Sequence, residues 1–137
     1  IKTIVLDFDG VLHTSPENPF TQMPLLKKCL LNHLQSVEIV ISSSWRFSHS
    51  INELRCMFPR TLQPLIVNVT GSAVIGRHAR WKEIQAYVSA YGIKDYKIID
   101  DSKFEFPETV GSTLILCNPS VGIDTVQIKQ LEAWLSL

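Results

Sequence analysis

The chain has 137 residues, 45% of them apolar and 19% charged, which is typical of a single globular domain and argues against a disordered chain. Lys and Arg together number 13, as do Asp and Glu, so the balanced charge gives no general reason to expect a polyanionic partner. Three widely spaced cysteines disfavour a zinc site or a disulfide scaffold. No apolar run reaches the roughly 20 residues of a membrane span. We therefore expect one soluble, cytoplasmic domain over residues 1–137.

Apolar, strand-like runs alternate with helical patterns along the chain. Five strands are predicted, over residues 3–6, 37–41, 65–69, 96–99 and 113–117. Four helices are predicted between and after them, over residues 24–34, 51–57, 79–91 and 125–135. Apolar strands that alternate with amphipathic helices favour a mostly parallel sheet with helices on both faces. We therefore expect an α/β fold, a three-layer α/β/α sandwich with a Rossmann-like sheet.

Three of the predicted helices carry local end signals. Ser50 and Glu53 have the spacing of a capping box, and so do Asp124 and Gln127. Gly92 fits the C-terminal stop of the third helix. That helix has an apolar stripe at helical spacing, formed by Trp81, Ile84, Tyr87 and Val88.

Polar clusters follow three of the predicted strands. Asp7 and Asp9 follow the first strand, the serines at 42–44 follow the second, and Asp100 with Asp101 follows the fourth. In an extended strand, residues i and i+2 point to the same side, so the first two carboxylates could project together. Ligands in parallel sheets bind beyond the carboxyl ends of the strands. We therefore expect the three clusters to meet in one site.

Clustered carboxylates favour a hard cation such as Mg²⁺, which binds through one or two carboxylates, waters and phosphate oxygens. A serine hydroxyl and a cation from the third helix, Arg80 or Lys82, could then hold phosphoryl oxygens. Simpler alternatives exist for each group. The serines could begin a turn or cap a helix, the two cations could form a solvated helix face, and Asp100 with Asp101 could be a polar turn. The three tryptophans are interpreted as packing residues, and the four histidines are assigned no role.

Four motifs, in this order along the chain, resemble the haloacid dehalogenase (HAD) phosphatase superfamily. They are DFDGVLH at 7–13, SSSWR at 42–46, RWKEI at 80–84 and IIDDS at 98–102. The resemblance spans nearly the whole chain and is closest to the small HAD domain of Swiss Army Knife RNA-repair proteins. It implies a Mg²⁺-dependent phosphatase that hydrolyses phosphomonoesters through an aspartyl-phosphate. A non-catalytic phosphate-binding or regulatory domain with the same fold is the alternative.

The resemblance also implies roles for individual residues. Asp7 would be the nucleophile that attacks phosphorus. Asp9 would protonate the leaving group and then activate water. Ser43 is the best match to the hydroxyl that binds the phosphoryl group, with Ser42 as the alternative.

Charge stabilisation and metal binding are implied in the same way. Arg80 is the best match to the basic residue that offsets charge in the transition state, where most members carry lysine, and Lys82 is the alternative. Asp100 or Glu105 could complete the metal shell. The Mg²⁺ ligands implied by the resemblance are Asp7, Asp101 and the backbone carbonyl of Asp9.

The two usual insertion points for a cap domain are short in this sequence, so we expect a capless or minimally capped fold. An open site suits a large substrate, such as a nucleic-acid end or a phosphoprotein. The phosphorylated partner could be RNA or a nucleotide. A locally basic segment between residues 45 and 82, with one acidic residue, gives mild support for an anionic polymer. Its cations are Arg46, Arg55, Arg60, Arg77, Arg80 and Lys82.

Overall fold

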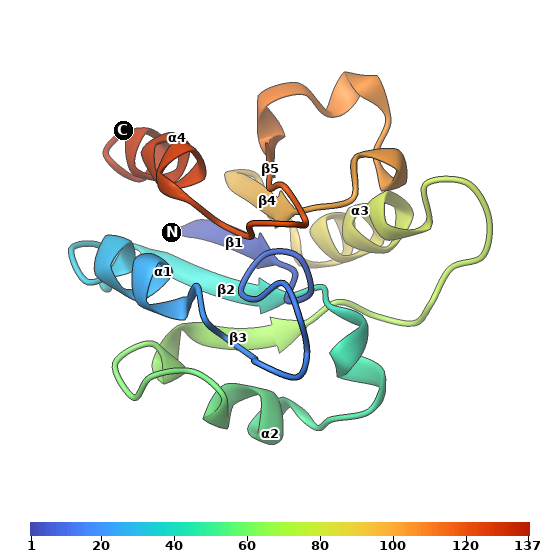
Figure 1. The fold of residues 1–137 in the computed structure, drawn as a ribbon. Helices are drawn as coiled ribbons and strands as arrows, with labels where there is room; N and C mark the ends of the chain where they lie inside the picture. The colour runs from blue at the N-terminus through green and yellow to red at the C-terminus, as the bar shows by residue number, and fades with distance from the viewer.

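The computed structural model describes residues 1–137 and contains one five-stranded sheet in which every neighbouring pair of strands is parallel (Figure 1). The strands are β1 (Lys2–Leu6), β2 (Val37–Ile41), β3 (Ile66–Val69), β4 (Tyr96–Asp100) and β5 (Leu114–Leu116). Their order is β3-β2-β1-β4-β5, so the strand order reverses between β1 and β4. Ligand sites of open parallel sheets lie at this switch point.

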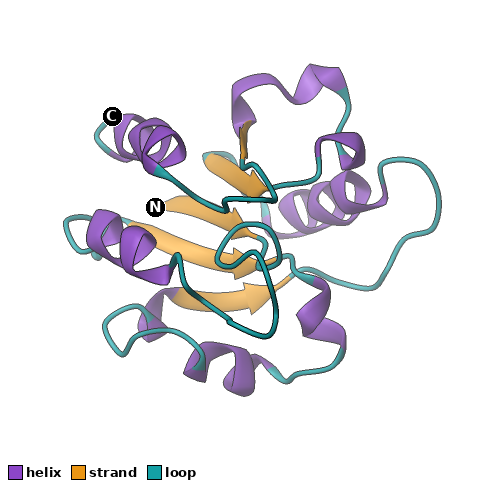
Figure 2. Ribbon diagram, in the orientation of Figure 1, coloured by secondary structure: helices purple, strands orange, loops and turns teal.

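Helices cover both faces of the sheet, which confirms the predicted α/β fold (Figure 2). The α-helices are α1 (Met23–Leu30), α2 (Ile51–Cys56), α3 (Ala79–Tyr91) and α4 (Thr125–Leu135). Short 3-10 segments are η1 (Ser44–Phe47), η2 (Gln63–Leu65), η3 (Lys103–Glu105) and η4 (Glu108–Thr113). Side chains of α1, α2 and α4 join the larger core, whereas α3 packs on the opposite face. None of the helices has the length and apolar character needed to cross a membrane.

The central strand β1 is buried on both faces. Leu6 belongs to the larger core under α1 and α4, whereas Val5 packs against Ile84 of α3. In the ladders, Leu6 pairs with Ile41 of β2 and with Ile99 of β4. The residues that follow these three paired positions, Asp7, Ser42 and Asp100, therefore lie side by side.

Local capping signals form as predicted. The Ser50 hydroxyl accepts from the backbone N–H of Glu53, and the Glu53 carboxylate accepts from the backbone N–H of Ser50. Asp124 and Gln127 make the same reciprocal pair at the start of α4. Gly92 ends α3 with a φ of 63°, in the left-handed region that glycine adopts most readily.

The prediction of a helix over residues 24–34 is wrong at its C-terminal end, because α1 stops at Leu30. The backbone N–H of His33 donates to the Leu30 carbonyl at 2.9 Å, and that of Ser36 donates to the His33 carbonyl at 3.0 Å, so the chain continues as turns. These turns bring the Ser36 carbonyl within 2.9 Å of the Lys2 backbone N–H in β1. Pairing with the central strand thus competes with a further turn of helix.

The carboxyl edge of the sheet is not covered by a cap domain, as predicted. Residues 7–22, between β1 and α1, form a loop of turns without a helix, and residues 71–77 form an exposed loop before α3. Between β2 and α3 the chain contains only η1, α2, η2 and β3. The edge where the polar clusters lie is therefore open.

Candidate active site at the carboxyl edge of the sheet

Three carboxylates from two neighbouring strands converge at this edge. Asp7 directly follows β1, Asp100 is the last residue of β4, and Asp101 follows it. One oxygen from each lies within 4.8 Å of the others. Asp7 and Asp100 are buried, and Asp101 is partly exposed. The predicted meeting of the first and fourth strand ends is therefore present in the structure.

Arg80, in the first turn of α3, enters the same cluster. Its Nη1 atom lies 2.8 Å from Asp100 Oδ2 and 3.3 Å from Asp7 Oδ1. The Arg80 side chain is 18% exposed, and its other terminal nitrogen makes no hydrogen bond within the protein. Lys82 is exposed and has no carboxylate within ion-pair distance. Of the two candidate cations, the structure brings Arg80 to the carboxylates.

The cluster carries more negative than positive charge. Burial raises the pKa of Asp7 well above its usual range, repulsion from Asp100 raises it further, and the Arg80 guanidinium only partly opposes these effects. Burial also raises the pKa of Asp100, to about 6, against the lowering effects of Arg80 and the Ser102 backbone N–H. A group of buried carboxylates with this imbalance attracts a cation.

The donor set and the available space both suit a hard divalent cation. All three side chains offer carboxylate oxygens, the ligands that Mg²⁺ prefers, and no thiolate or imidazole joins them. Gly10 has a φ of 76°, and a Cβ atom at this position would overlap the Asp101 carboxylate. Only glycine leaves room for that carboxylate beside the turn after β1.

Two fully buried serines follow β2 at the level of Asp7. The Ser42 backbone N–H donates to the Leu6 carbonyl at 2.9 Å, which places Ser42 beside the end of β1. The Ser43 hydroxyl accepts from the Trp45 backbone N–H at 3.2 Å and so caps η1. The Ser42 hydroxyl has no hydrogen-bond partner. The capping alternative is thus realised at Ser43, while Ser42 has the unused hydroxyl.

Asp9 does not join the carboxylate cluster with its side chain. The side chain is 53% exposed, and its Oδ1 atom lies 2.7 Å from Nε2 of His13. The indole N–H of Trp45 donates to Asp9 Oδ2 at 3.1 Å. Sequence reasoning missed His13, because a spacing of four residues predicts a side-chain contact only within a helix, and residues 9–13 form turns. Trp45 packs as expected, against Phe8 and other aromatic rings, and also binds Asp9.

Glu105 lies next to the site without entering the carboxylate cluster. Its Oε2 atom accepts from the backbone N–H of Arg80 at 3.3 Å. A carboxylate at the first turn of a helix satisfies an unpaired N–H and interacts well with the helix dipole. Glu105 therefore fixes the start of α3, and with it the position of the Arg80 side chain.

A buried ion pair behind the site was not anticipated from the sequence. Arg46 Nη2 lies 2.8 Å from Glu83 Oε1, and the two side chains are 2% and 8% exposed. The same guanidinium donates to the carbonyls of Ser42 at 2.7 Å, Ser43 at 3.1 Å and Gly71 at 3.1 Å. Arg46 therefore ties the serine segment to α3 and to the loop that precedes it.

The six cations between residues 45 and 82 do not form one surface, which corrects the expected basic patch. Arg46 and Arg80 are committed to internal ion pairs, and Arg55 donates to the Ile66 carbonyl. The exposed ones are Arg60, Arg77 and Lys82.

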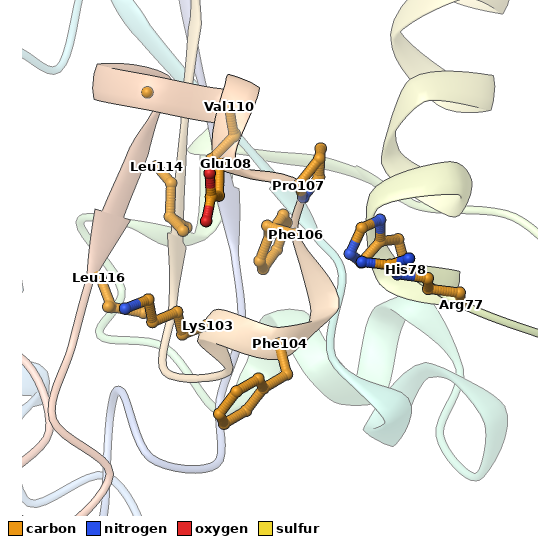
Figure 3. A pocket seen from close by; sticks show the side chains of 11 residues that line it. Arg77, His78, Lys103, Phe104, Phe106, Pro107, Glu108, Val110, Leu114 and Leu116 are labelled. Carbon is orange, nitrogen blue, oxygen red and sulfur yellow. The ribbon is translucent and has the colours of Figure 1, made fainter.

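An open groove of about 1130 Å³ lies between the start of α3 and the segment from η3 to β5 (Figure 3). Arg77 and His78 line one side of it, and Phe106 and Val110 line the other. Lys103 adds a second cation to the lining. Neither the three carboxylates nor Arg80 lines the groove, although Arg77 and Lys103 are within three residues of Arg80 and Asp101 in the chain.

Comparison with known proteins places this arrangement in a family. The family described as the HAD domain in Swiss Army Knife RNA repair proteins matches residues 3–128. No curated protein and no solved structure gives a significant match to the chain. The match includes β1, β2, α3 and β4, which supply the carboxylates, the serines and Arg80, and it confirms the family suggested by the motifs. The chain belongs to the family of HAD domains in Swiss Army Knife RNA repair proteins.

Proposed function

We propose that this domain is a Mg²⁺-dependent phosphatase that hydrolyses phosphomonoesters through an aspartyl-phosphate. Family membership supports a phosphatase-like or other HAD-type function. The observation that carries the proposal is the contact of the Arg80 guanidinium with both Asp7 and Asp100, beside Asp101. These residues come from three separate segments and form one anion-and-cation cluster at an open edge.

Asp7 is the proposed nucleophile. It follows β1 directly, and the strand pairs on both sides hold its backbone in place. One carboxylate oxygen forms the new bond to phosphorus while the bond from phosphorus to the leaving-group oxygen breaks. Asp9 gives a proton to that oxygen and later removes one from the water that hydrolyses the aspartyl-phosphate. Its partly exposed carboxylate, outside the buried cluster, suits exchange of protons with substrate and water.

Arg80 and a serine are the proposed ligands of the phosphoryl oxygens. The free terminal nitrogen of Arg80 can donate to a phosphoryl oxygen while Nη1 stays with the carboxylates. The hydroxyl hydrogen of Ser43 is free to donate to a phosphoryl oxygen, because the hydroxyl oxygen accepts from the Trp45 backbone N–H. Ser42, with its unpartnered hydroxyl, is the second candidate.

Asp7 and Asp101, with the backbone carbonyl of Asp9, are the proposed Mg²⁺ ligands, and Asp100 supports the site through Arg80. When bound, the ion would neutralise the carboxylates and the phosphoryl oxygens. The crowded carboxylates and the space that Gly10 leaves for Asp101 support this assignment.

The proposed substrate is a phosphorylated nucleic-acid end, in keeping with the RNA repair context of the family. The open carboxyl edge admits a large substrate, and the groove offers Arg77 and Lys103 for further phosphates and the exposed Phe104 for apolar contact. Cationic grooves with aromatic residues are typical of sites for single-stranded nucleic acid. A phosphate-binding domain without turnover is the competing function, and the presence of both Asp7 and Asp9 argues against it.

Hydrolysis of p-nitrophenyl phosphate by the purified chain, with Mg²⁺ and with EDTA, tests the chemistry. We expect turnover that requires Mg²⁺ and that is lost in Asp7→Asn. Turnover that persists in Asp7→Asn would exclude this residue as the nucleophile. If the chain shows no turnover, binding of Mg²⁺ and beryllofluoride distinguishes a poor substrate from a non-catalytic domain. An active chain should then be compared on RNA with 5′ or 3′ phosphate and on phosphopeptides.

A further inference from the structure

We infer that His13 and Trp45 are positioning residues that hold the Asp9 carboxylate in one orientation for proton transfer. Each donates an N–H to a different oxygen of Asp9, at 2.7 Å from His13 Nε2 and at 3.1 Å from Trp45 Nε1. We call these three side chains the Asp9 clamp. This inference rests on the proposed function, because it gives Asp9 the role of acid and base.

The hydrogen bonds around His13 determine which ring nitrogen carries the hydrogen. The backbone N–H of Phe20 lies 3.2 Å from Nδ1 of His13, and a backbone N–H can only donate. Nδ1 must therefore be the acceptor, and the hydrogen is on Nε2, where it points to Asp9. Both ring nitrogens of the fully buried His13 side chain thus have a hydrogen-bond partner.

The backbone around Gly10 brings His13 back to Asp9. The Gly10 N–H donates to the His13 carbonyl at 2.9 Å, and the backbones of Asp9 and His13 form a bridge. Phe20 packs edge-on to the His13 ring with centroids 5.3 Å apart. The loop after β1 is therefore folded around a buried imidazole whose exposed neighbour is the Asp9 carboxylate.

Trp45 closes the other side of the clamp. Its indole packs edge-on against Phe8 at 5.4 Å and stacks on His49 at 5.5 Å between ring centroids. These contacts leave the indole N–H directed at Asp9 Oδ2. A rigid donor on each carboxylate oxygen restricts rotation of a side chain that is 53% exposed and would otherwise sample several rotamers.

The clamp leaves Asp9 able to act. A carboxylate oxygen has two lone pairs, so each oxygen that accepts one N–H keeps a second site for the proton that passes to the leaving group or comes from water. In the first step the proton moves from Asp9 to the leaving-group oxygen as its bond to phosphorus breaks. The two N–H donors then bind the carboxylate that remains, in the same orientation.

A matched pair of variants tests the positioning role. His13→Gln keeps an N–H donor near the position of Nε2, whereas His13→Met has the same length without a donor. The readout is kcat/KM, which covers the step that forms the aspartyl-phosphate, for an alkyl phosphate and for p-nitrophenyl phosphate. Nitrophenolate leaves without much help from an acid, so the two substrates report differently on Asp9. Trp45→Phe keeps an aromatic ring at this position, although a smaller one, and removes the second donor.

For His13→Met and Trp45→Phe we expect kcat/KM on the alkyl phosphate to fall roughly 10- to 100-fold, part of the 10²- to 10⁴-fold that general acid catalysis supplies. On p-nitrophenyl phosphate we expect a fall of less than about 3-fold, and His13→Gln should recover most of the loss. Equal losses on both substrates, or no rescue by His13→Gln, would show a merely structural role and overturn the inference.

The orientation of the ring is measured without any activity. In ¹⁵N NMR spectra of the whole chain, His13 should be protonated at Nε2 and not at Nδ1, and the Nε2 proton should exchange faster in Asp9→Ala. A ring protonated at Nδ1, or exchange unchanged in Asp9→Ala, would overturn the clamp. If wild type lacks phosphatase activity while these signals are as expected, the proposed function fails and the geometry of the clamp stands.

Discussion

We predict that removing either partner of the buried Arg46–Glu83 pair strongly lowers the free energy of unfolding. Glu83→Gln keeps the shape of the side chain but leaves the Arg46 guanidinium, 2% exposed, without its counter-ion. One amide oxygen must also replace two carboxylate oxygens, one that accepts from Arg46 and one that accepts from the Val74 backbone N–H at 3.0 Å. Removing one partner of a buried ion pair costs about 3–5 kcal/mol, because the other charge stays buried.

The size of the effect in a melting experiment follows from the chain length. At about 2.1 cal/mol/K per residue, 137 residues give an unfolding entropy of roughly 290 cal/mol/K. Each kcal/mol then lowers the melting temperature by about 3.5 °C, so Glu83→Gln should melt roughly 10–17 °C below wild type. Arg46→Met should show a loss of similar size. Because the residues act as one unit, the double variant should lose less than the sum.

Urea denaturation and calorimetry of wild type, the two single variants and the double variant provide the measurement. Arg60→Met is the matched control, since Arg60 is exposed and makes no ion pair, and it should lie within about 0.5 kcal/mol of wild type. A loss of less than about 1 kcal/mol in Glu83→Gln, with additive single variants, would refute the reasoning.

Three further predictions concern the site and the thiols. Gly10→Ala should weaken Mg²⁺ binding, measured by calorimetric titration, because its Cβ displaces the Asp101 carboxylate and its φ is 76°; unchanged affinity would contradict the proposed ligand set. In EDTA, the raised pKa of Asp100 means that the folded chain binds this proton more tightly than the unfolded chain, whose carboxyl titrates near 3.8. The free energy of unfolding should therefore fall by up to ~3 kcal/mol between pH 4 and pH 7, and Asp100→Asn should show a smaller fall. Of the three thiols, exposed Cys56 should react with a disulfide reagent in the native chain, whereas Cys117, buried and with its pKa raised to about 12, should not.

The sequence favours Arg80 over Lys82 for a second reason, besides the resemblance, as the cation that lies at the carboxylates. Arg80 precedes Ile84 by four residues and Tyr87 by seven, so it lies on the same face of α3 as the apolar stripe. Lys82 is two residues further along, about 200° around the helix, and points to solvent. Helical periodicity, applied to the cations as well as to the apolar residues, therefore predicts that Arg80 faces the protein and that Lys82 faces solvent.

Two other features could not be read from the sequence. Arginine is a residue type that is mostly exposed to solvent, and the partner of Arg46, Glu83, is 37 residues away in the sequence. Asp9 follows the strand with the spacing that would aim it with Asp7, but the turn at Gly10 directs its carboxylate to His13 and Trp45 instead. Both outcomes depend on which side chains the folded chain brings close together.

The strands, the capping boxes and the edge at which Asp7 and Asp100 lie can be predicted from local periodicity and from the polar residue that ends each apolar run. The burial of Arg46 and the contact of His13 with Asp9 arise only in the folded chain. Burial and hydrogen-bond partners depend on contacts across the fold, which the composition of a short segment does not encode.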